Sequence, residues 1–529
     1  MPTTQQYDAL NRLTRIGSVS SAGSVVDFQY GYNAANQRTN IILGPDNSHW
    51  DYAYDALGQV TSGKKHWPDG SSVAGQQFEY QFDSIGNRKQ TKAGGDNSGQ
   101  NLRAANYTNN LLNQITGRDV PGAADILGIA HASATVTVNG QSTSRKGEYY
   151  WKGLGISNQL AAIYQGVTTT AYLAGTTNTT TGSLLLPMSP QRFFYDADGN
   201  LLSDGVWTNT WDAENRLVST ETTTAVPQGA RAKETWSYYP DGRWAERVIY
   251  AWTNSAWSAQ TTQRFIWDGN LIVAILDVAT GSIQTFLRGL DLSGTMQRAG
   301  GAGGLLATTD DSTGLSCFYA HDGNGSVVAL VNFLDGTVAA RYEYGPFAEP
   351  IRMTGPMALA NPMRFSGQFA DDVLRTLKYL HREYVPSTGR WLSRDPIDQK
   401  GGINLYSFVL NDPIDAFDLI GEKPFWCGPL EKKIRSYLST PEELRAWDQF
   451  VNGSGDIKLS VNEMDSIVNS SARYTTVLDA WMADCTKPWA AWTDRVATIA
   501  DTLGSPWAYA IGQLSITLKS SCHCGCLSF

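Results

Sequence analysis

A short pattern recurs along the chain: an aromatic residue, an aspartate, and then a glycine or asparagine, often followed by an arginine. The pattern starts at Tyr7 (YDALNRLTRIG) and returns at Tyr54, Phe82, Tyr195 and Trp211. An aromatic side chain suits a pleated strand, aspartate can hydrogen-bond its own backbone two residues on, and Gly or Asn tolerates a positive φ. Because an apolar or β-branched pair follows, each copy predicts a strand, a tight turn and another strand.

One such motif would be an ordinary hairpin turn, but at least eight related copies in one chain indicate a repeat architecture. In a repeat fold each unit buries its apolar face against its neighbours. Abundant Gly (51), Tyr (24) and Trp (17), with only 17% charged residues, favour the same β-rich body with many turns. We therefore predict a mainly β fold, with a long twisted antiparallel sheet over residues 1–350.

The amino-acid composition and pattern change in two segments outside the repeats. Residues 119–190 are rich in Thr, Ser, Gly and Ala, and segments such as SATVTVNG alternate as strands do, so we predict a β-rich insertion. Towards the C-terminus, Thr440 and Ser460 each begin a capping box, with a glutamate three residues on. Such boxes start helices, and we predict a small, mostly α domain over residues 422–529.

Composition argues against several classes of function. No run of 18 apolar residues predicts a membrane-spanning helix, and the first residues lack the apolar stretch of a signal peptide. A net charge of −9 disfavours nucleic-acid binding by the repeats. We predict no cofactor. The one candidate metal site, formed by Cys522, His523, Cys524 and Cys526, lacks the spacing of a zinc knuckle, and an unstructured tail is favoured.

The segment before the predicted helical domain reads GRWLSRDPIDQKGGINLYSFVLNDPIDAFDLIG. It is similar to the RHS-repeat-associated core, and the repeats resemble the YD repeats of RHS proteins, of the C components of insecticidal toxin complexes and of teneurins. The resemblance covers roughly residues 1–421, with the core over 351–421. It implies a β ribbon wound into a shell that encloses a variable C-terminal toxic domain, with the core closing one end.

In many such proteins the core is also an aspartyl autoprotease that releases the enclosed domain. The family pattern is Asp-Pro-x-Gly, about twenty residues, and Asp-Pro-x-Gly-Leu, with cleavage after the leucine. The resemblance implies that Asp395 and Asp418 form the catalytic pair. Two carboxylates that share a site cannot both ionise, which is how such a pair divides the roles of acid and base. The alternative is that both aspartates only form turns.

The chain departs from this pattern at three positions. Asp398 stands where the first motif has glycine, Leu419 where the second has proline, and Glu422 where the leucine precedes the cut. The implied cleavage site is therefore Gly421, Glu422 and Lys423. Loss of the proline and the extra charge of Glu422 argue against cleavage, and the competing hypotheses of an active and an inactive core stay open at this point.

Two functions of different classes follow from the resemblance. The first is the shell-forming part of a polymorphic toxin, with residues 423–529 as its own cargo and an effector activity that the sequence does not identify. Its expected partners are an immunity protein and a component of a secretion system or toxin complex. The second is a cell-surface adhesion protein whose aromatic sheet binds glycans, and an inactive remnant is a third interpretation. All imply a secreted or surface location. Since the first repeat starts at Tyr7, we also expect the chain to open within a larger array.

Overall fold

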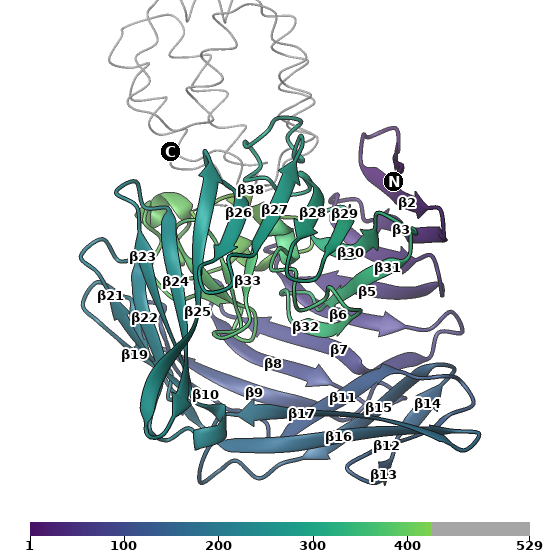
Figure 1. Ribbon diagram of the computed structural model, residues 1–529, viewed down its shortest axis with the longest axis horizontal. Coiled ribbons are helices and arrows are strands. Elements are labelled where there is room, and N and C mark those ends of the chain that lie inside the picture. Colours follow the sequence, from purple (N-terminus) through teal and green to yellow (C-terminus); the bar gives the residue numbers. More distant parts are fainter. Residues whose placement is uncertain (423, 426–529) are drawn as a thin grey trace, which may run out of the picture.

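The computed structural model describes residues 1–422 and 424–425, and these are almost entirely antiparallel β-structure (Figure 1). The predicted mainly β class is confirmed. The described residues contain no helix that is long and apolar enough to cross a membrane. The predicted helical domain, Lys423 and the candidate metal ligands of the C-terminal tail lie outside the described residues.

The first of two large sheets has 11 strands and is a meander, in which each strand pairs with the next along the chain until a late strand completes the edge. Its strands are β1 (Thr3–Tyr7), β2 (Leu13–Ser20), β3 (Gly23–Tyr32), β4 (Arg38–Leu43), β5 (Ser48–Tyr54), β6 (Val60–His66), β7 (Ser72–Phe82), β8 (Arg88–Gly94), β9 (Leu102–Asn109), β10 (Ile115–Arg118) and β18 (Gln191–Arg192).

The second large sheet has 14 strands in strict chain order, so the repeat array is divided between two sheets. A short 3₁₀ helix, η1 (Gln228–Ala230), lies in one of its connections. The strands are β19 (Phe194–Tyr195), β20 (Leu201–Ser203), β21 (Trp207–Trp211), β22 (Leu217–Thr222), β23 (Ala232–Tyr238), β24 (Trp244–Thr253), β25 (Ala256–Asp268), β26 (Leu271–Asp277), β27 (Ile283–Arg288), β28 (Leu305–Asp310), β29 (Leu315–His321), β30 (Val327–Asn332), β31 (Val338–Tyr344) and β32 (Pro350–Thr354).

Two small sheets lie between the large ones in the sequence. One has the order β11-β15-β14 and the other the order β13-β12-β16-β17. Their strands are β11 (Ala123–Ile129), β12 (Thr135–Val138), β13 (Gln141–Ser142), β14 (Ser144–Lys146), β15 (Tyr149–Gly155), β16 (Ile163–Leu173) and β17 (Thr176–Leu186).

The recurrent motif has a specific structure in these sheets. Oδ1 of Asp8 accepts hydrogen bonds from the N–H groups of Leu10 and Arg12, both at 2.9 Å, while Asn11 between them has a φ of 62°. The same arrangement recurs at the aspartates of later copies. The aspartate therefore closes the turn through two backbone donors, which is why the motif needs Gly or Asn at the left-handed position.

The aromatic residue of the motif connects one unit to the unit before it. The hydroxyl of Tyr32 donates to the carbonyl of Leu13 at 2.7 Å, and that of Tyr238 donates to the carbonyl of Leu217 at 2.8 Å. In both cases the acceptor is the first residue of the strand after the preceding turn. The Arg12 guanidinium also lies over the Tyr32 ring, 4.9 Å from its centroid. Tyrosine and arginine thus hold adjacent turns in register.

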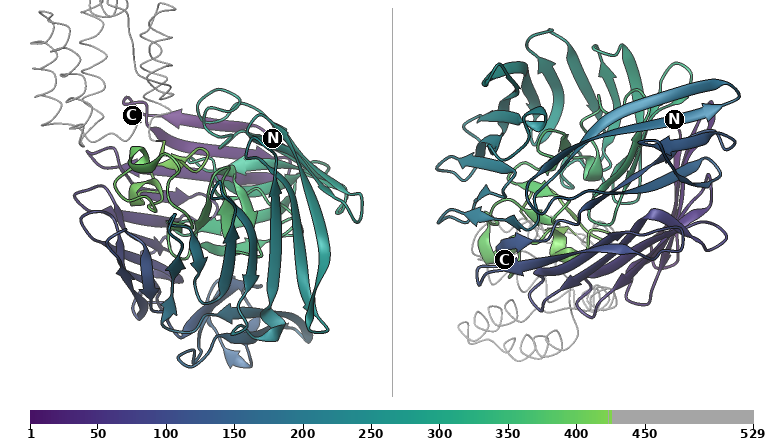
Figure 2. Two further views of the ribbon diagram at one scale, coloured as in Figure 1. Left: turned by 90° about the vertical axis from the view of Figure 1, so that its left-hand side faces the viewer. Right: turned by 90° about the horizontal axis from the view of Figure 1, so that it is seen from below.

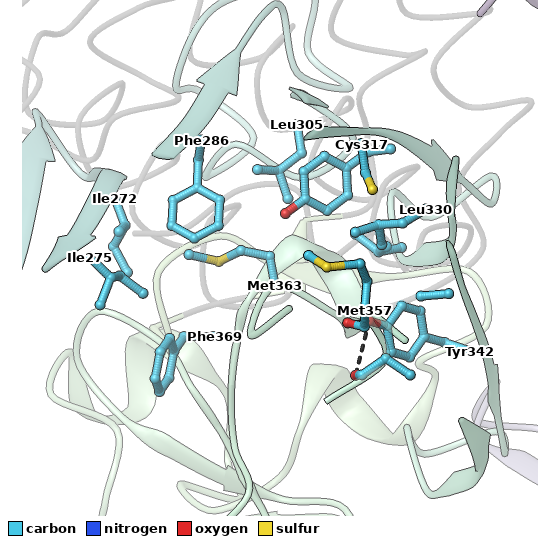
Figure 3. Close-up of a cluster of buried hydrophobic side chains, with 14 of the residues drawn as sticks. Ile272, Ile275, Phe286, Leu305, Cys317, Leu330, Tyr342, Met357, Met363 and Phe369 are labelled. Carbon is cyan, nitrogen blue, oxygen red and sulfur yellow. Dashed lines mark hydrogen bonds between the residues drawn. The ribbon is translucent and has the colours of Figure 1, made fainter. Parts of the chain in front are cut away.

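The core segment, residues 351–421, lies on the inner side of both large sheets (Figure 2). Phe369 and Met363 pack in one cluster with Ile272 and Phe286 of the second sheet (Figure 3). Ile414 packs with Trp50 of the first sheet. Apart from β32, the elements of the core segment and its continuation are η2 (Phe365–Gly367), β33 (Phe369–Asp371), β34 (Thr376–Lys378), β35 (Glu383–Val385), β36 (Arg390–Trp391), η3 (Asp398–Gly401), η4 (Val409–Asn411), β37 (Phe417–Asp418) and β38 (Pro424–Phe425).

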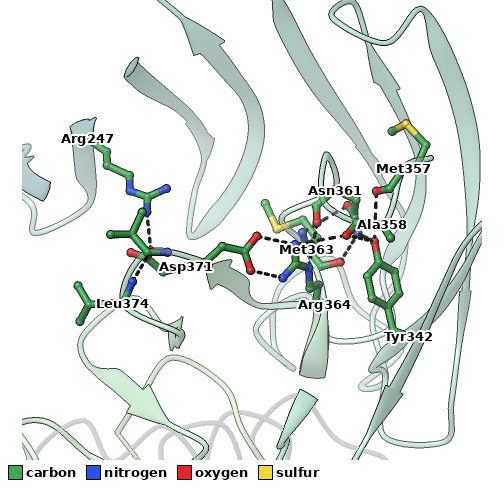
Figure 4. A network of polar contacts seen from close by, with 11 residues as sticks. Arg247, Tyr342, Met357, Ala358, Asn361, Met363, Arg364, Asp371 and Leu374 are labelled. Carbon is green, nitrogen blue, oxygen red and sulfur yellow. Dashed lines mark hydrogen bonds and ion pairs between the residues drawn. The ribbon is translucent and has the colours of Figure 1, made fainter. Parts of the chain in front are cut away.

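Buried polar contacts fix the core segment to the second sheet (Figure 4). The Arg247 guanidinium forms ion pairs with Glu234 at 2.6 Å and with Asp371 of the core segment. Burial and the neighbouring carboxylate of Asp371 raise the pKa of Glu234 to about 8. In the same region the Asn361 amide donates to the Tyr342 hydroxyl at 3.1 Å. Because charged groups inside a protein need their partners, these contacts define one position for the core segment.

Candidate active site

The two aspartates that the sequence predicts as a catalytic pair are close together in the structure. Asp395 lies in the loop after β36, Asp418 ends β37, and Arg382 stands just before β35. Nη2 of Arg382 is 2.9 Å from Oδ2 of Asp395 and 3.6 Å from Oδ2 of Asp418. All three residues are buried. One guanidinium therefore holds both carboxylates.

Arg382 belongs to neither of the two aspartate motifs in the sequence. Its Nε donates to the carbonyl of Gly421, and its Nη1 donates to the carbonyl of Leu405 at 3.3 Å. The guanidinium also lies over the Trp391 ring, 4.2 Å from the centroid. Two buried carboxylates need a nearby cation, which predicts an arginine or lysine at the site. The core segment contains several arginines, however, and nothing in their spacing distinguishes Arg382 from the others.

Asp418 binds the implied cleavage site directly. Its Oδ1 accepts hydrogen bonds from the N–H groups of Ile420 at 3.2 Å, Gly421 at 2.7 Å and Glu422 at 3.1 Å. Gly421 has a φ of 87°, and a β-carbon there would lie 3.0 Å from Cβ of Tyr379. Glycine is therefore required at this position, and the turn that it makes brings the N–H of Glu422 to Asp418.

Gly401 separates Asp395 from the backbone of Glu422. A β-carbon on Gly401 would lie 2.2 Å from Oδ2 of Asp395 and 2.8 Å from the carbonyl oxygen of Glu422. The carboxylate and the carbonyl are therefore neighbours across a residue that has no side chain. This places Asp395 beside the carbonyl group of Glu422.

The environment of the pair changes its protonation. Burial raises the pKa of Asp395 to about 7; the Arg382 charge opposes this shift, and the charges of Asp418 and Glu422 add to it. Burial also raises the pKa of Asp418 to about 6, against Arg382 and the backbone donors. Both pKa values lie above the usual range for aspartate, so near neutral pH the pair can hold one proton between its two carboxylates. General acid–base catalysis of hydrolysis requires one protonated and one ionised group.

Each departure from the family pattern has a local explanation. Asp398 has a φ of 55°, the left-handed conformation that favours glycine but that Asp tolerates, and it pairs with Arg394 at 3.1 Å. Leu419 packs in an apolar cluster with Ala299 and Ala302 of the glycine-rich segment between β27 and β28. The Glu422 carboxylate lies 3.5 Å from Nε2 of His381.

Asp395 lines a cavity of about 580 Å³ between the core segment and the turns of the second sheet, so water can reach this carboxylate. Asp418 is not among the residues that line the cavity. Among the described residues, no group of three or more His, Cys, Asp or Glu residues is arranged to hold a metal ion.

No protein-family model matches the chain. It is 28% identical over 298 residues to double-stranded DNA deaminase toxin A of Burkholderia cenocepacia, a match that covers 53% of this chain and 20% of that protein. It is 40% identical over 62 residues to toxin protein Tse5 of Pseudomonas aeruginosa, which covers 12% of this chain and 5% of that protein. The chain thus spans a fifth or less of the length of these two relatives, both of which are toxins.

Among solved structures, the crystal structure of TcdB2-TccC3-Cdc42 aligns with 79% of this chain and 20% of its own, at 17% identity and a TM-score of 0.38. Because this structural similarity is low, the fold is assigned from the strands and sheets of this chain alone.

Proposed function

We propose that this chain is the wall and core of an RHS-type polymorphic toxin, and that the core cuts the chain after Glu422 to release residues 423–529. Similarity to two toxins supports the class of protein. The observation that carries the cleavage is the position of Asp395 and Asp418, held by one arginine beside the carbonyl of Glu422.

The proposed reaction is hydrolysis of the peptide bond between Glu422 and Lys423. The ionised carboxylate of the pair takes a proton from water as the water oxygen bonds to the carbonyl carbon of Glu422. The protonated carboxyl group of the pair donates a hydrogen bond that polarises the carbonyl oxygen. The carbon–nitrogen bond then breaks, a proton passes to the leaving nitrogen, and a carboxylate and an amine remain. Arg382 keeps the Gly421 carbonyl and both carboxylates in place.

A released domain would be far larger than either of two cavities found beside the core segment. A compact domain of about 100 residues has a radius of gyration of about 13 Å and a volume on the order of 2 × 10⁴ Å³. The two cavities beside the core segment measure about 740 and 580 Å³. We therefore propose that a further chain, such as a toxin-complex component, completes the shell around the cargo, and that an immunity protein protects the producing cell.

The glycan-binding alternative receives less support. Trp50, Trp236 and Trp244 are each no more than 5% exposed, because they pack against the core segment and neighbouring strands. Their rings are therefore not available to stack on sugars. The inactive-remnant interpretation is tested by the cleavage experiment and by its cellular counterpart.

The test of the proposed function is cleavage of the purified full chain. After incubation at pH 6–7, a denaturing gel and intact mass should give one fragment that ends at Glu422 and one that begins at Lys423. Asp395→Asn should leave the chain whole. Asp398→Asn is the matched control, because that side chain is 65% exposed in the same loop and Asn also tolerates its conformation. An intact wild-type chain after prolonged incubation would contradict the proposal.

A cellular experiment tests the toxin class separately. The full chain and its Asp395→Asn variant should be expressed in bacteria at equal soluble levels. Growth arrest by the wild type, with weaker arrest by the variant, is the expected result. Normal growth with complete cleavage would separate the protease from any toxic activity in that host.

A further inference from the structure

The side chain of Glu422 has a specific partner. Oε1 of Glu422 is 3.5 Å from Nε2 of His381. The imidazole and the carboxylate are both partly exposed, at 36% and 24% of their side-chain area. They lie beside the buried acid pair but do not belong to it. The resemblance implies leucine at this position, so an acidic residue there needs a different partner from the one that leucine would have.

Residues 381 and 382 also bind the backbone of residues 420 and 421. The N–H of His381 donates to the carbonyl of Ile420 at 3.0 Å, and the side-chain Nε of Arg382 donates to the carbonyl of Gly421. One backbone and one side-chain hydrogen bond therefore hold the two segments together next to Glu422.

We infer that His381 is the specificity-determining residue of this site, which lets the chain be cut after glutamate. The inference rests on the proposed function. Without a partner, the Glu422 carboxylate would be a third negative charge near Asp395 and Asp418, with only Arg382 to balance it. Below its pKa, the protonated His381 supplies a second cation 3.5 Å from the Glu422 carboxylate.

The pairing depends on pH because the imidazole must be protonated to form an ion pair. Burial lowers the pKa of His381, the charge of Glu422 opposes this shift, and the charge of Arg382 adds to it. The ion pair is present below the histidine pKa and is lost as the pH rises through it. The other charged groups around the adjacent cavity are Asp198, Glu214, Arg216, Asp241, Arg394, Asp395 and Asp398.

The experiment is a double-mutant cycle on the purified full chain, with cleavage rates measured from pH 5 to pH 8. His381→Gln should slow cleavage about tenfold at pH 5–6 and less at pH 8. In the Glu422→Leu background, the same substitution should change the rate less than twofold at any pH. Equal slowing in both backgrounds would overturn the inference, because His381 would then support the site without reading Glu422.

Failure of this inference differs from failure of the proposed function. If Glu422→Leu cuts and the wild type does not, the acid pair is active but His381 does not accommodate glutamate. If neither cuts, the proposed function fails, and the pairing is then tested by itself in the uncut Asp395→Asn chain. There, Glu422→Gln should lower the histidine pKa measured by NMR. An unchanged pKa would overturn the pairing.

Discussion

Gly401 provides the sharpest test of the site, because the absence of a side chain at this residue leaves Asp395 next to the Glu422 carbonyl. In Gly401→Ala, the new methyl group would lie 2.2 Å from Oδ2 of Asp395 and 2.8 Å from the Glu422 carbonyl oxygen. Non-bonded heavy atoms are comfortable at about 3.5 Å, so the carboxylate and the carbonyl must move apart by about 1 Å. A misplacement of this size costs about 100-fold in rate.

The assay is the single-turnover rate of cleavage, followed by intact mass at the pH optimum. A 100-fold loss corresponds to about 2.7 kcal/mol of transition-state stabilisation. Gly182→Ala is the matched control, since a β-carbon there meets nothing within 4 Å. Overpacking at Gly401 should also cost about 1–3 kcal/mol of stability, so thermal unfolding must show that the variant is folded. A folded Gly401→Ala chain that cuts at the wild-type rate would refute the proposed geometry.

Three further predictions concern charge. Arg382→Lys should abolish cleavage in a folded chain, because an ammonium cannot hold the two carboxylates and the Gly421 carbonyl together; rapid cleavage would contradict this. The cleavage rate should be bell-shaped, with limbs near pH 6 and pH 7 set by the pKa values of Asp418 and Asp395, and a flat profile would contradict it. The pKa of Glu234 is raised to about 8 in the folded protein. Its contribution to the free energy of unfolding is therefore complete below about pH 4 and is lost as the pH rises through 8. Glu234→Gln in the Asp395→Asn chain should therefore flatten the fall of the melting temperature between pH 6 and 9, and an unchanged slope would exclude this role.

The turns were predictable from sequence because their interactions are local. Asp8 uses donors two and four residues away, so the motif contains nearly all the residues that close it. The division of the array into two sheets was not predictable, since β18 returns to β10 across the whole insertion and no local pattern marks that pairing. Sequence thus predicts the units of this fold better than their boundaries.

Some residues of the candidate site were also predictable from the sequence, and others were not. Asp395 and Asp418 were found by resemblance to a spaced motif, and Gly421 came with them. Arg382 and Gly401 were missed because each is defined by what it meets in three dimensions: a guanidinium between two carboxylates, and a missing side chain between a carboxylate and a carbonyl. Neither property leaves a pattern in the sequence.

Asp418 accepts three hydrogen bonds from the N–H groups of residues 420–422, and all three donors lie on the retained side of the proposed cut. The new chain end would therefore stay in the site as a bound product. Its terminal carboxylate would stand beside Asp395 and, as a like charge, raise the pKa of that aspartate further. Each molecule would therefore perform one reaction and then inhibit itself, and a second peptide added in trans should remain uncut.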